Sequence, residues 1–212
     1  MTRSAIVLAG GRGLRLGGTS KADITRGGMS LLERLSRELA QCGCNNRVCV
    51  GPESIAIPPG MTRTCEEPAE GGPVAGIVWG MDALGLLEKP SGTVAVLSVD
   101  APGAASAAPR LFEALEGNPD ADAAMLVDRE GRYHHLIAVY RARALTKRIR
   151  ALATSMPADS APWFAGVRDM AAKHLVSEFD IVEVAEQDTS LPESRDIDTP
   201  ADLRAWNARL GE

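Results

Sequence analysis

A glycine-rich stretch near the start of the chain combines cationic side chains with an unhindered backbone. The apolar run Ala5–Ala9 stops at Gly10 and Gly11, and Arg15 and Lys21 follow shortly afterwards. Glycine lets the backbone turn sharply and approach a ligand because no Cβ atom stands in the way. Successive backbone N–H groups in such a turn form an anion-binding concavity, to which arginine and lysine add full positive charge. The pattern therefore predicts a polyphosphate site.

Two better-known phosphate-binding loops do not fit this stretch. A P-loop needs glycine before its lysine and serine or threonine after it, whereas here Ser20 precedes Lys21 and Ala22 follows. A GxGxxG fingerprint counted from Gly11 places its third position on Leu16, and no acidic residue ends a second strand where that motif requires one. A glycine-rich turn with surface cations is the alternative to a nucleotide site here.

Two carboxylates stand beside predicted elements where they could hold a ligand. Thr93–Val99 is the strongest strand pattern, apolar and β-branched on both faces, and Asp100 follows it directly. Open α/β sheets bind ligands beside the carboxyl ends of their strands. Asp100 could instead cap the next helix, and Asp198, which precedes Thr199, is placed to cap the last helix.

A helix N-terminus is predicted in the segment Gly72–Gly76. Pro73 suits the first turn of a helix, and the first N–H groups of that helix are free to face a ligand. A purely structural loop and cap explains the same residues equally well.

Four ordered motifs resemble those of molybdenum cofactor guanylyltransferases of the MobA type, within the sugar-nucleotidyltransferase-like superfamily. They are LAGGxxxRxGxxxK at 8–21, GPLAG at 72–76, CDxP at 99–102 and NxNTPxDL at 196–203. The chain departs from these patterns at Leu16 for methionine, Val99 for cysteine, Ala104 and Ala105 for bulky residues, and Asp196 and Asp198 for asparagine. The strand that begins at His134 also resembles a strand of the family that begins (H/Q)-P-L, and His135 stands at its proline position.

The resemblance implies a role for each motif. Arg15, Lys21 and Asp100 would be catalytic, with the cations on the phosphates, and Asp100 and Asp198 would hold Mg²⁺. The implied nucleotide-binding residues are Leu8, Ala9, Gly10, Gly11, Gly13, Arg15, Lys21, Gly72, Pro73, Gly76 and Asp100. An acidic residue before the GPVAG helix also takes part in nucleotide binding in the family, and Glu67 and Glu70 are both candidates.

The implied reaction is Mg²⁺-dependent transfer of GMP from GTP to molybdopterin, with release of pyrophosphate. A cytidylyltransferase for molybdopterin is the nearest alternative, followed by a nucleotidyltransferase for another phosphate acceptor. A catalytically weak nucleotide-binding or cofactor-binding protein is the alternative from a different class. The region 156–173 matches no motif and is a candidate contact for the acceptor.

The rest of the chain alternates predicted strands and helices, which indicates a single α/β domain over residues 1–212. Ser30, with Glu33, should cap a helix through Leu39. Further strands are expected at 47–50, 121–127, 134–141 and 181–184, with an edge strand within 58–64, a turn at 128–131, and helices at 111–115 and 141–153. With the resemblance, this predicts a three-layer α/β/α fold with a mostly parallel, Rossmann-like sheet. Neighbouring side chains of a strand point to opposite faces, so His134 and His135 should not share one site.

Composition and charge argue against some classes of partner and location. The net charge of −5 argues against a nucleic-acid partner, and no apolar run approaches the roughly 20 residues of a membrane span. The N-terminus has no signal-peptide pattern, so a cytoplasmic location is expected. Cys42, Cys44, Cys49 and Cys65 lack zinc-site spacing and are expected to be free thiols.

Overall fold

The computed structural model describes residues 1–10, 20–154, 165–187 and 192–208. A seven-stranded sheet runs through the molecule in the order β5-β4-β1-β6-β8-β7-β9. Its strands are β1 (Arg3–Leu8), β4 (Cys44–Val50), β5 (Met61–Thr64), β6 (Thr93–Ser98), β7 (Ala123–Val127), β8 (Tyr133–Arg141) and β9 (Ile181–Ala185). β8 pairs antiparallel with β6 and β7, whereas the remaining pairs are parallel. The predicted mostly parallel sheet is confirmed.

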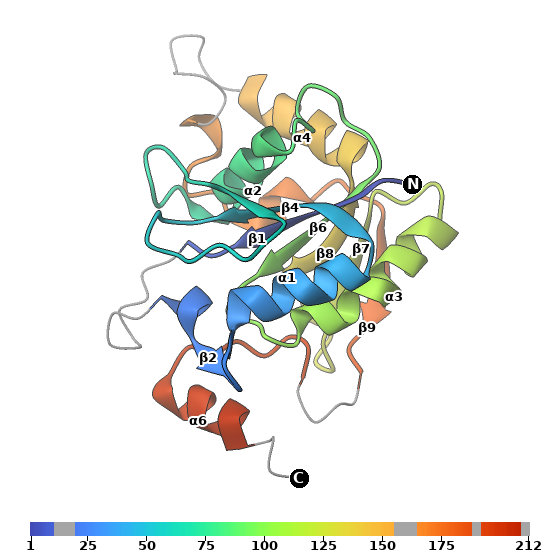
Figure 1. Cartoon of the computed structure of the whole chain (residues 1–212). Helices are drawn as coiled ribbons and strands as arrows, with labels where there is room; N and C mark the ends of the chain where they lie inside the picture. The colour runs from blue at the N-terminus through green and yellow to red at the C-terminus, as the bar shows by residue number, and fades with distance from the viewer. Residues whose placement is uncertain (11–19, 155–164, 188–191, 209–212) are drawn as a thin grey trace.

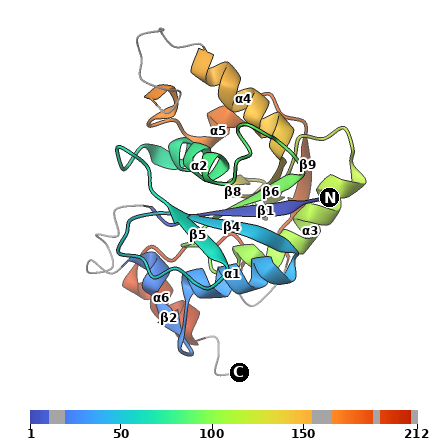
Figure 2. The same ribbon diagram turned by 45° about the horizontal axis from the view of Figure 1, so that its top comes forward.

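Helices cover both faces of this sheet, which gives the three expected layers (Figures 1 and 2). One face carries α1 (Leu31–Gln41) and α3 (Ala104–Gly117). The other face carries α2 (Gly72–Ala83), α4 (Ala142–Thr154) and α5 (Ala172–Leu175). Side chains of β1 alternate between the two layers: Ala5 and Val7 pack toward α1 and α3, while Ile6 and Leu8 pack toward α2.

Smaller elements lie below the carboxyl edge of the sheet. A short hairpin of β2 (Thr25–Arg26) and β3 (Met29–Ser30) follows the 3-10 turn Lys21–Asp23, and α6 (Pro200–Ala208) lies beside it (Figure 1). The guanidinium of Arg26 sits 4.7 Å from the ring centroid of Trp206, which joins the hairpin to α6. A second 3-10 turn spans Ala165–Val167.

The predicted elements are recovered, with one clear error of length. The Ser30 hydroxyl accepts a hydrogen bond from Glu33 N at 3.1 Å, as the capping pattern predicted. The helix expected at 111–115 instead runs over Ala104–Gly117 with Pro109 inside it. Its first turns were missed because Pro109 reads as a helix breaker, while small alanines bury that end of α3 against the sheet.

The structure also bears on the expectations about the cysteines and about a membrane span. All four thiols are free, and Cys44 and Cys49 are buried. Burial raises the pKa of Cys44 and of Cys49 to about 12. Within the described residues, no helix combines the length and apolar character that crossing a membrane requires.

Candidate functional site

The central strands deliver the first site residues to one edge of the sheet. Val99 N donates to Leu8 O at 3.0 Å, and Ala9 N donates to Val50 O at 2.8 Å, so the strand ends stay paired up to the loops. Leu8, Ala9, Gly10 and Asp100 therefore lie along one edge, where α/β sheets bind ligands. Gly11, Gly13 and Arg15 lie outside the described residues.

Lys21 joins two carboxylates that are far apart in the sequence. Its Nζ lies 2.8 Å from Asp100 Oδ2 and 2.6 Å from Asp198 Oδ1. Partial burial alone would lower the pKa of Lys21, but the hydrogen bonds to Asp100 and Asp198 outweigh that effect and raise it. The Ser98 hydroxyl donates to the other oxygen of Asp100. The structure thus brings together three residues that the motifs singled out separately.

Residues 192–198, here called the strap, carry Asp198 to this cluster. Ile197 is buried, and its N–H donates to Asp100 O at 2.8 Å. The strap also passes so close to Gly103 that a Cβ there would meet Pro192 O at 2.9 Å. A glycine at the N-terminal end of α3 is therefore what allows the strap to approach.

A buried ion pair anchors the start of the strap to α3. The Glu193 side chain is 1% exposed, and Arg110 Nη2 donates to its two carboxylate oxygens at 2.7 and 2.5 Å. Gln187 N and the Ser106 hydroxyl also donate to this carboxylate, so its charge is well compensated. No sequence motif pointed to Glu193 or Arg110, because their pairing spans most of the second half of the chain.

The expectation that Asp198 caps the last helix is wrong. The cap is Thr199, whose hydroxyl accepts from Asp202 N at 3.2 Å, while Asp202 Oδ2 accepts from Thr199 N at 2.9 Å. This reciprocal pair satisfies the start of α6 one residue later than predicted. Asp198 is consequently left to pair with Lys21.

In the loop before α2, the acidic side chain of Glu66 packs against the helix, and Glu66 is not one of the two predicted candidates, Glu67 and Glu70. Glu66 Oε2 accepts from Gly71 N at 2.6 Å, and burial raises the pKa of Glu66. A Cβ on Gly76 would lie 2.9 Å from Glu66 Oε1 and 3.0 Å from Leu8 Cδ2. The GPVAG glycine therefore lets α2 pack directly on the end of β1, with Glu66 beside it. Sequence reasoning considered Glu67 and Glu70 for a nucleotide contact; Glu66 joins them as a candidate, because the fold turns its carboxylate toward Gly71.

The segment after 164 holds this loop in place. Arg168 Nη1 donates to Pro68 O at 2.7 Å, and Asp169 N donates to Gly71 O at 2.7 Å. Gly72, which has a φ of +86°, has its missing Cβ position 3.4 Å from Asp169 Cα. Gly72 and Pro73 thus begin α2 as predicted, and residues 168–169 pack against the start of this helix.

A cavity of about 410 Å³ opens beside Asp100. Its lining comes from the end of β6, from β8, from residues 171–173 and from the strap, and consists of Ser98, Asp100, Ala101, Tyr133, His134, His135, Leu136, Ile137, Ala171, Ala172, Lys173 and Asp196. Residues 171–173 belong to the region expected to contact the acceptor, and residues 156–164 of that region lie outside the described residues.

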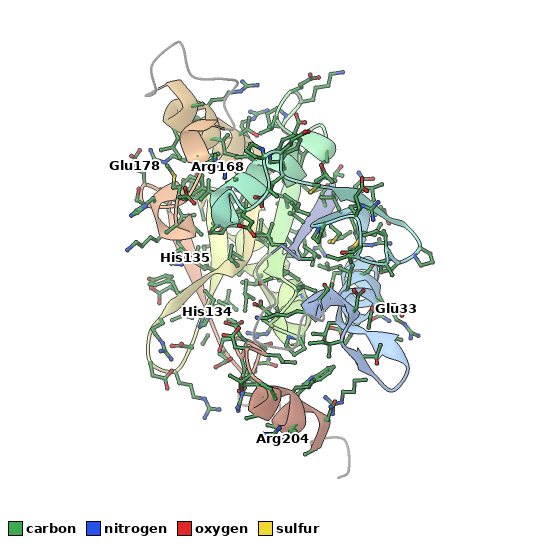
Figure 3. All side chains as sticks on the ribbon, turned by 90° about the vertical axis from the view of Figure 1, so that its left-hand side faces the viewer. Glu33, His134, His135, Arg168, Glu178 and Arg204 are labelled. Carbon is green, nitrogen blue, oxygen red and sulfur yellow. The ribbon has the colours of Figure 1, made fainter. Side chains whose placement is uncertain are left out.

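Both histidines border this cavity, which corrects the prediction that they would not share a site. Between β7 and β8 the pairing steps from Met125–Ala138 to Leu126–His134, so β8 bulges by several residues. Strict alternation fails at such a bulge. Figure 3 shows His134 and His135 one above the other along β8, below Arg168. The buried Tyr140 hydroxyl donates to His135 O at 2.7 Å and supports the bulge.

Asp196 adds a third carboxylate near the cluster. Desolvation by the surrounding protein, together with the charges of Asp100 and Asp198, raises the pKa of Asp196 to about 6. The positive charge of Lys21 opposes this rise only in part.

Asp100 and Asp198 suit a hard cation such as Mg²⁺. Their oxygens already converge on one cationic atom, the Lys21 nitrogen, within 2.8 Å. Magnesium is commonly bound through one or two carboxylates, with substrate phosphates and water as the other ligands. Among the described residues, no group of three or more His, Cys, Asp or Glu side chains is arranged to hold a metal alone. The donor set therefore fits a metal that binds together with a phosphate ligand.

Comparison with known proteins identifies the family. Molybdopterin-guanine dinucleotide biosynthesis protein A from Archaeoglobus fulgidus has a similar structure, with a TM-score of 0.64 and 18% identity over 99% of this chain and 100% of that one. The 2-C-methyl-D-erythritol 4-phosphate cytidylyltransferase from Thermus thermophilus matches with a TM-score of 0.63 and 18% identity, over 99% and 98% of the two chains. A comparison with curated protein sequences finds no match. The family model of the MobA-like NTP transferase domain matches residues 5–174, so the chain belongs to the MobA-like NTP transferase family and is a nucleotidyltransferase by family.

Proposed function

We propose that the protein is a Mg²⁺-dependent molybdenum cofactor guanylyltransferase, which transfers GMP from GTP to molybdopterin and releases pyrophosphate. The observation that carries this proposal is the convergence of Lys21, Asp100 and Asp198 at the edge of a cavity large enough for an acceptor. The four motifs resemble those of this enzyme type, and the similar Archaeoglobus fulgidus protein carries its name. The cytoplasm is the location that we propose for the reaction.

The chain's own residues would act by positioning and by balancing charge. The loop N–H groups, Arg15 and Lys21 hold the triphosphate, with α2 and Glu66 along the nucleotide pocket. Asp100 and Asp198 would hold Mg²⁺, which offsets the negative charge of the phosphates. In the cavity, an acceptor phosphate oxygen attacks the α-phosphorus in line, the bond from that phosphorus to the bridging oxygen breaks, and pyrophosphate leaves. A phosphate monoester is already anionic near neutral pH, so positioning and electrostatic stabilisation supply most of the catalysis.

The test is pyrophosphate release with Mg²⁺ and molybdopterin, with GTP, CTP, ATP and UTP in separate reactions. Release with GTP alone is the predicted result. Preference for CTP would replace guanylyl transfer by cytidylyl transfer on the same site, an alternative favoured by the likeness to the Thermus thermophilus cytidylyltransferase.

If none of the four nucleotides gives pyrophosphate release, the proposed acceptor is contradicted. Screening sugar phosphates and other phosphate monoesters would then separate a different acceptor from a protein that only binds nucleotides. The second case predicts measurable GTP affinity without pyrophosphate from any acceptor.

A further inference from the structure

An aspartate–histidine pair lies at the cavity and has no part in the mechanism above. Asp128 directly follows β7, and its carboxylate is nearly fully buried. Its oxygens accept from Glu130 N at 3.0 Å, from Arg132 N at 2.9 Å and from Arg132 Nε at 2.9 Å. His134 Nε2 lies 3.1 Å from Asp128 Oδ2. The hairpin turn therefore builds a rigid anionic support for one ring nitrogen of His134.

This support fixes which ring nitrogen of His134 is engaged and which is left without a partner in the described part of the chain. The Arg132 N–H, together with the His134 and Arg132 side chains, holds the pKa of Asp128 well below its usual range, so Asp128 accepts and Nε2 carries the hydrogen. Nδ1 of His134 has no hydrogen-bond partner among the residues that the structure describes. His134 lines the cavity, and a carboxylate that fixes one ring nitrogen of a histidine orients the ring so that the other nitrogen can bind a ligand.

The charges around the cavity show which ligand this nitrogen suits. Asp100 and Asp196 form its acidic side, and both are negative when ionised. His134, His135 and Lys173 stand on the other walls, and burial lowers the pKa of His135, with further lowering from His134 and Lys173. Arg132 is engaged with Asp128 and Glu130, and Tyr133 with Glu183. An anionic group in the cavity could thus contact Lys173 of α5 and, when its ring is protonated, His134 of β8.

We propose that His134, positioned by Asp128, binds the phosphate of the acceptor through Nδ1. The acceptor itself rests on the proposed function, whereas the anion contact rests on the geometry of the cavity. The Nδ1–H of an imidazolium ring donates to a phosphate oxygen, whereas a neutral ring accepts only from a singly protonated phosphate, so the contact needs one proton between the ring and the phosphate. His134 is then the acceptor-binding residue and Asp128 is its positioning residue.

The direct test is ¹⁵N NMR of the imidazole rings, because the chain has only three histidines. Inorganic phosphate and glycerol phosphate are titrated separately into the intact protein. A saturable shift of the His134 ring nitrogens is expected, and the exposed His174 serves as the internal control. Absence of that shift, or an equal shift at His174, would overturn the proposal without the need for any variant.

Two variants then separate contact from support. His134→Gln should raise the Kd for phosphate and the KM for the acceptor about tenfold, the loss of one hydrogen bond to a charged group. The KM for the nucleotide should stay unchanged. Asp128→Asn should alter the tautomer balance of His134 and weaken phosphate binding, while His174→Gln should change neither quantity. An unchanged phosphate Kd in His134→Gln would refute the contact.

Failure of this inference can be told apart from failure of the proposed function. Asp100→Asn should abolish pyrophosphate release yet leave the phosphate-induced shift at His134. A wild-type protein that shows the shift but releases no pyrophosphate would contradict the enzyme proposal and retain the anion site. Turnover without any shift at His134 would support the enzyme proposal and contradict the anion site.

Discussion

At the scale of single residues, the positive charge of Lys21 lies between the carboxylates of Asp100 and Asp198 and offsets their negative charge in the metal-free protein. Its ammonium separates two carboxylates that would otherwise repel each other across the end of the sheet. A divalent cation bound by the same carboxylates would compete with Lys21 for them. Lys21 and the metal are therefore expected to replace one another in stabilising this pair of carboxylates.

This competition predicts how a neutral side chain behaves at position 21. In EDTA, Lys21→Met should lower the free energy of unfolding by about 1 kcal/mol, a value discounted for the partial exposure of the pair. Added Mg²⁺ should restore more stability to the variant than to the wild type. Chemical denaturation with and without Mg²⁺ measures both effects, with the exposed Lys89→Met as the matched control. Equal Mg²⁺ responses in Lys21→Met and wild type would count against a shared site.

Asp196 predicts a pH dependence whose sign follows from its raised pKa. The folded protein holds this proton up to about pH 6, whereas the unfolded chain releases it near about 3.9. Between those values the folded state binds more protons at Asp196, so the contribution of Asp196 to stability falls as the pH rises from about 4 to 6. Asp196→Asn should remove this fall in metal-free buffer. Urea titrations across that pH range test it, and an identical pH profile in both proteins would be the contrary result.

At the scale of elements, the strap turns the local chemistry of the chain end into a site. Three separate contacts hold it: the Glu193–Arg110 pair, the close approach at Gly103 and the hydrogen bond from Ile197 to Asp100. Asp198 lies at the end of the strap, directly before Thr199, the cap of α6, and its backbone also contacts the Asp202 carboxylate. Loosening the strap should therefore affect both stability and the placement of Asp198.

Glu193→Gln tests that dependence. The change breaks a buried ion pair and should cost about 3 kcal/mol of unfolding free energy, toward the low end because Arg110 is partly exposed. Activity should fall because the variant binds Mg²⁺ more weakly and needs a higher Mg²⁺ concentration, whereas the KM for the acceptor should stay the same. Glu116→Gln, which breaks the exposed pair with Arg3, should cost less than about 1 kcal/mol. Similar losses in both variants would remove the special role of the strap.

The same elements show how far sequence patterns reach. The strand ending at Asp100, the cap at Ser30 and the start of α2 are local features, and periodicity with turn chemistry predicted them. Glu66, the Glu193–Arg110 pair and the bulge that brings His134 and His135 to one cavity depend on contacts between distant segments. A strand alternation rule cannot foresee a bulge, because the extra residues appear only against the partner strand.

At the scale of the whole molecule, the sheet brings together motifs that are far apart in the sequence. Lys21 and Asp198, for example, are 177 residues apart and form a hydrogen bond. The parallel strands β1, β4 and β6 end at one edge, and the antiparallel β8 starts there, so its first residues form the cavity wall opposite Asp100. Helices on both faces keep that edge rigid, while the loops and the strap supply the charged groups. This division between scaffold and loops is typical of α/β enzymes.

The central claim is that the carboxylates at this edge drive nucleotidyl transfer. The most direct measurement is pyrophosphate release from GTP with Mg²⁺ and molybdopterin, comparing wild type, Asp100→Asn and the exposed Asp120→Asn at the opposite edge of the sheet. The proposed function predicts turnover in wild type and Asp120→Asn and a loss of about a thousandfold in Asp100→Asn, since a main source of charge stabilisation is gone. Undiminished turnover in Asp100→Asn would contradict it.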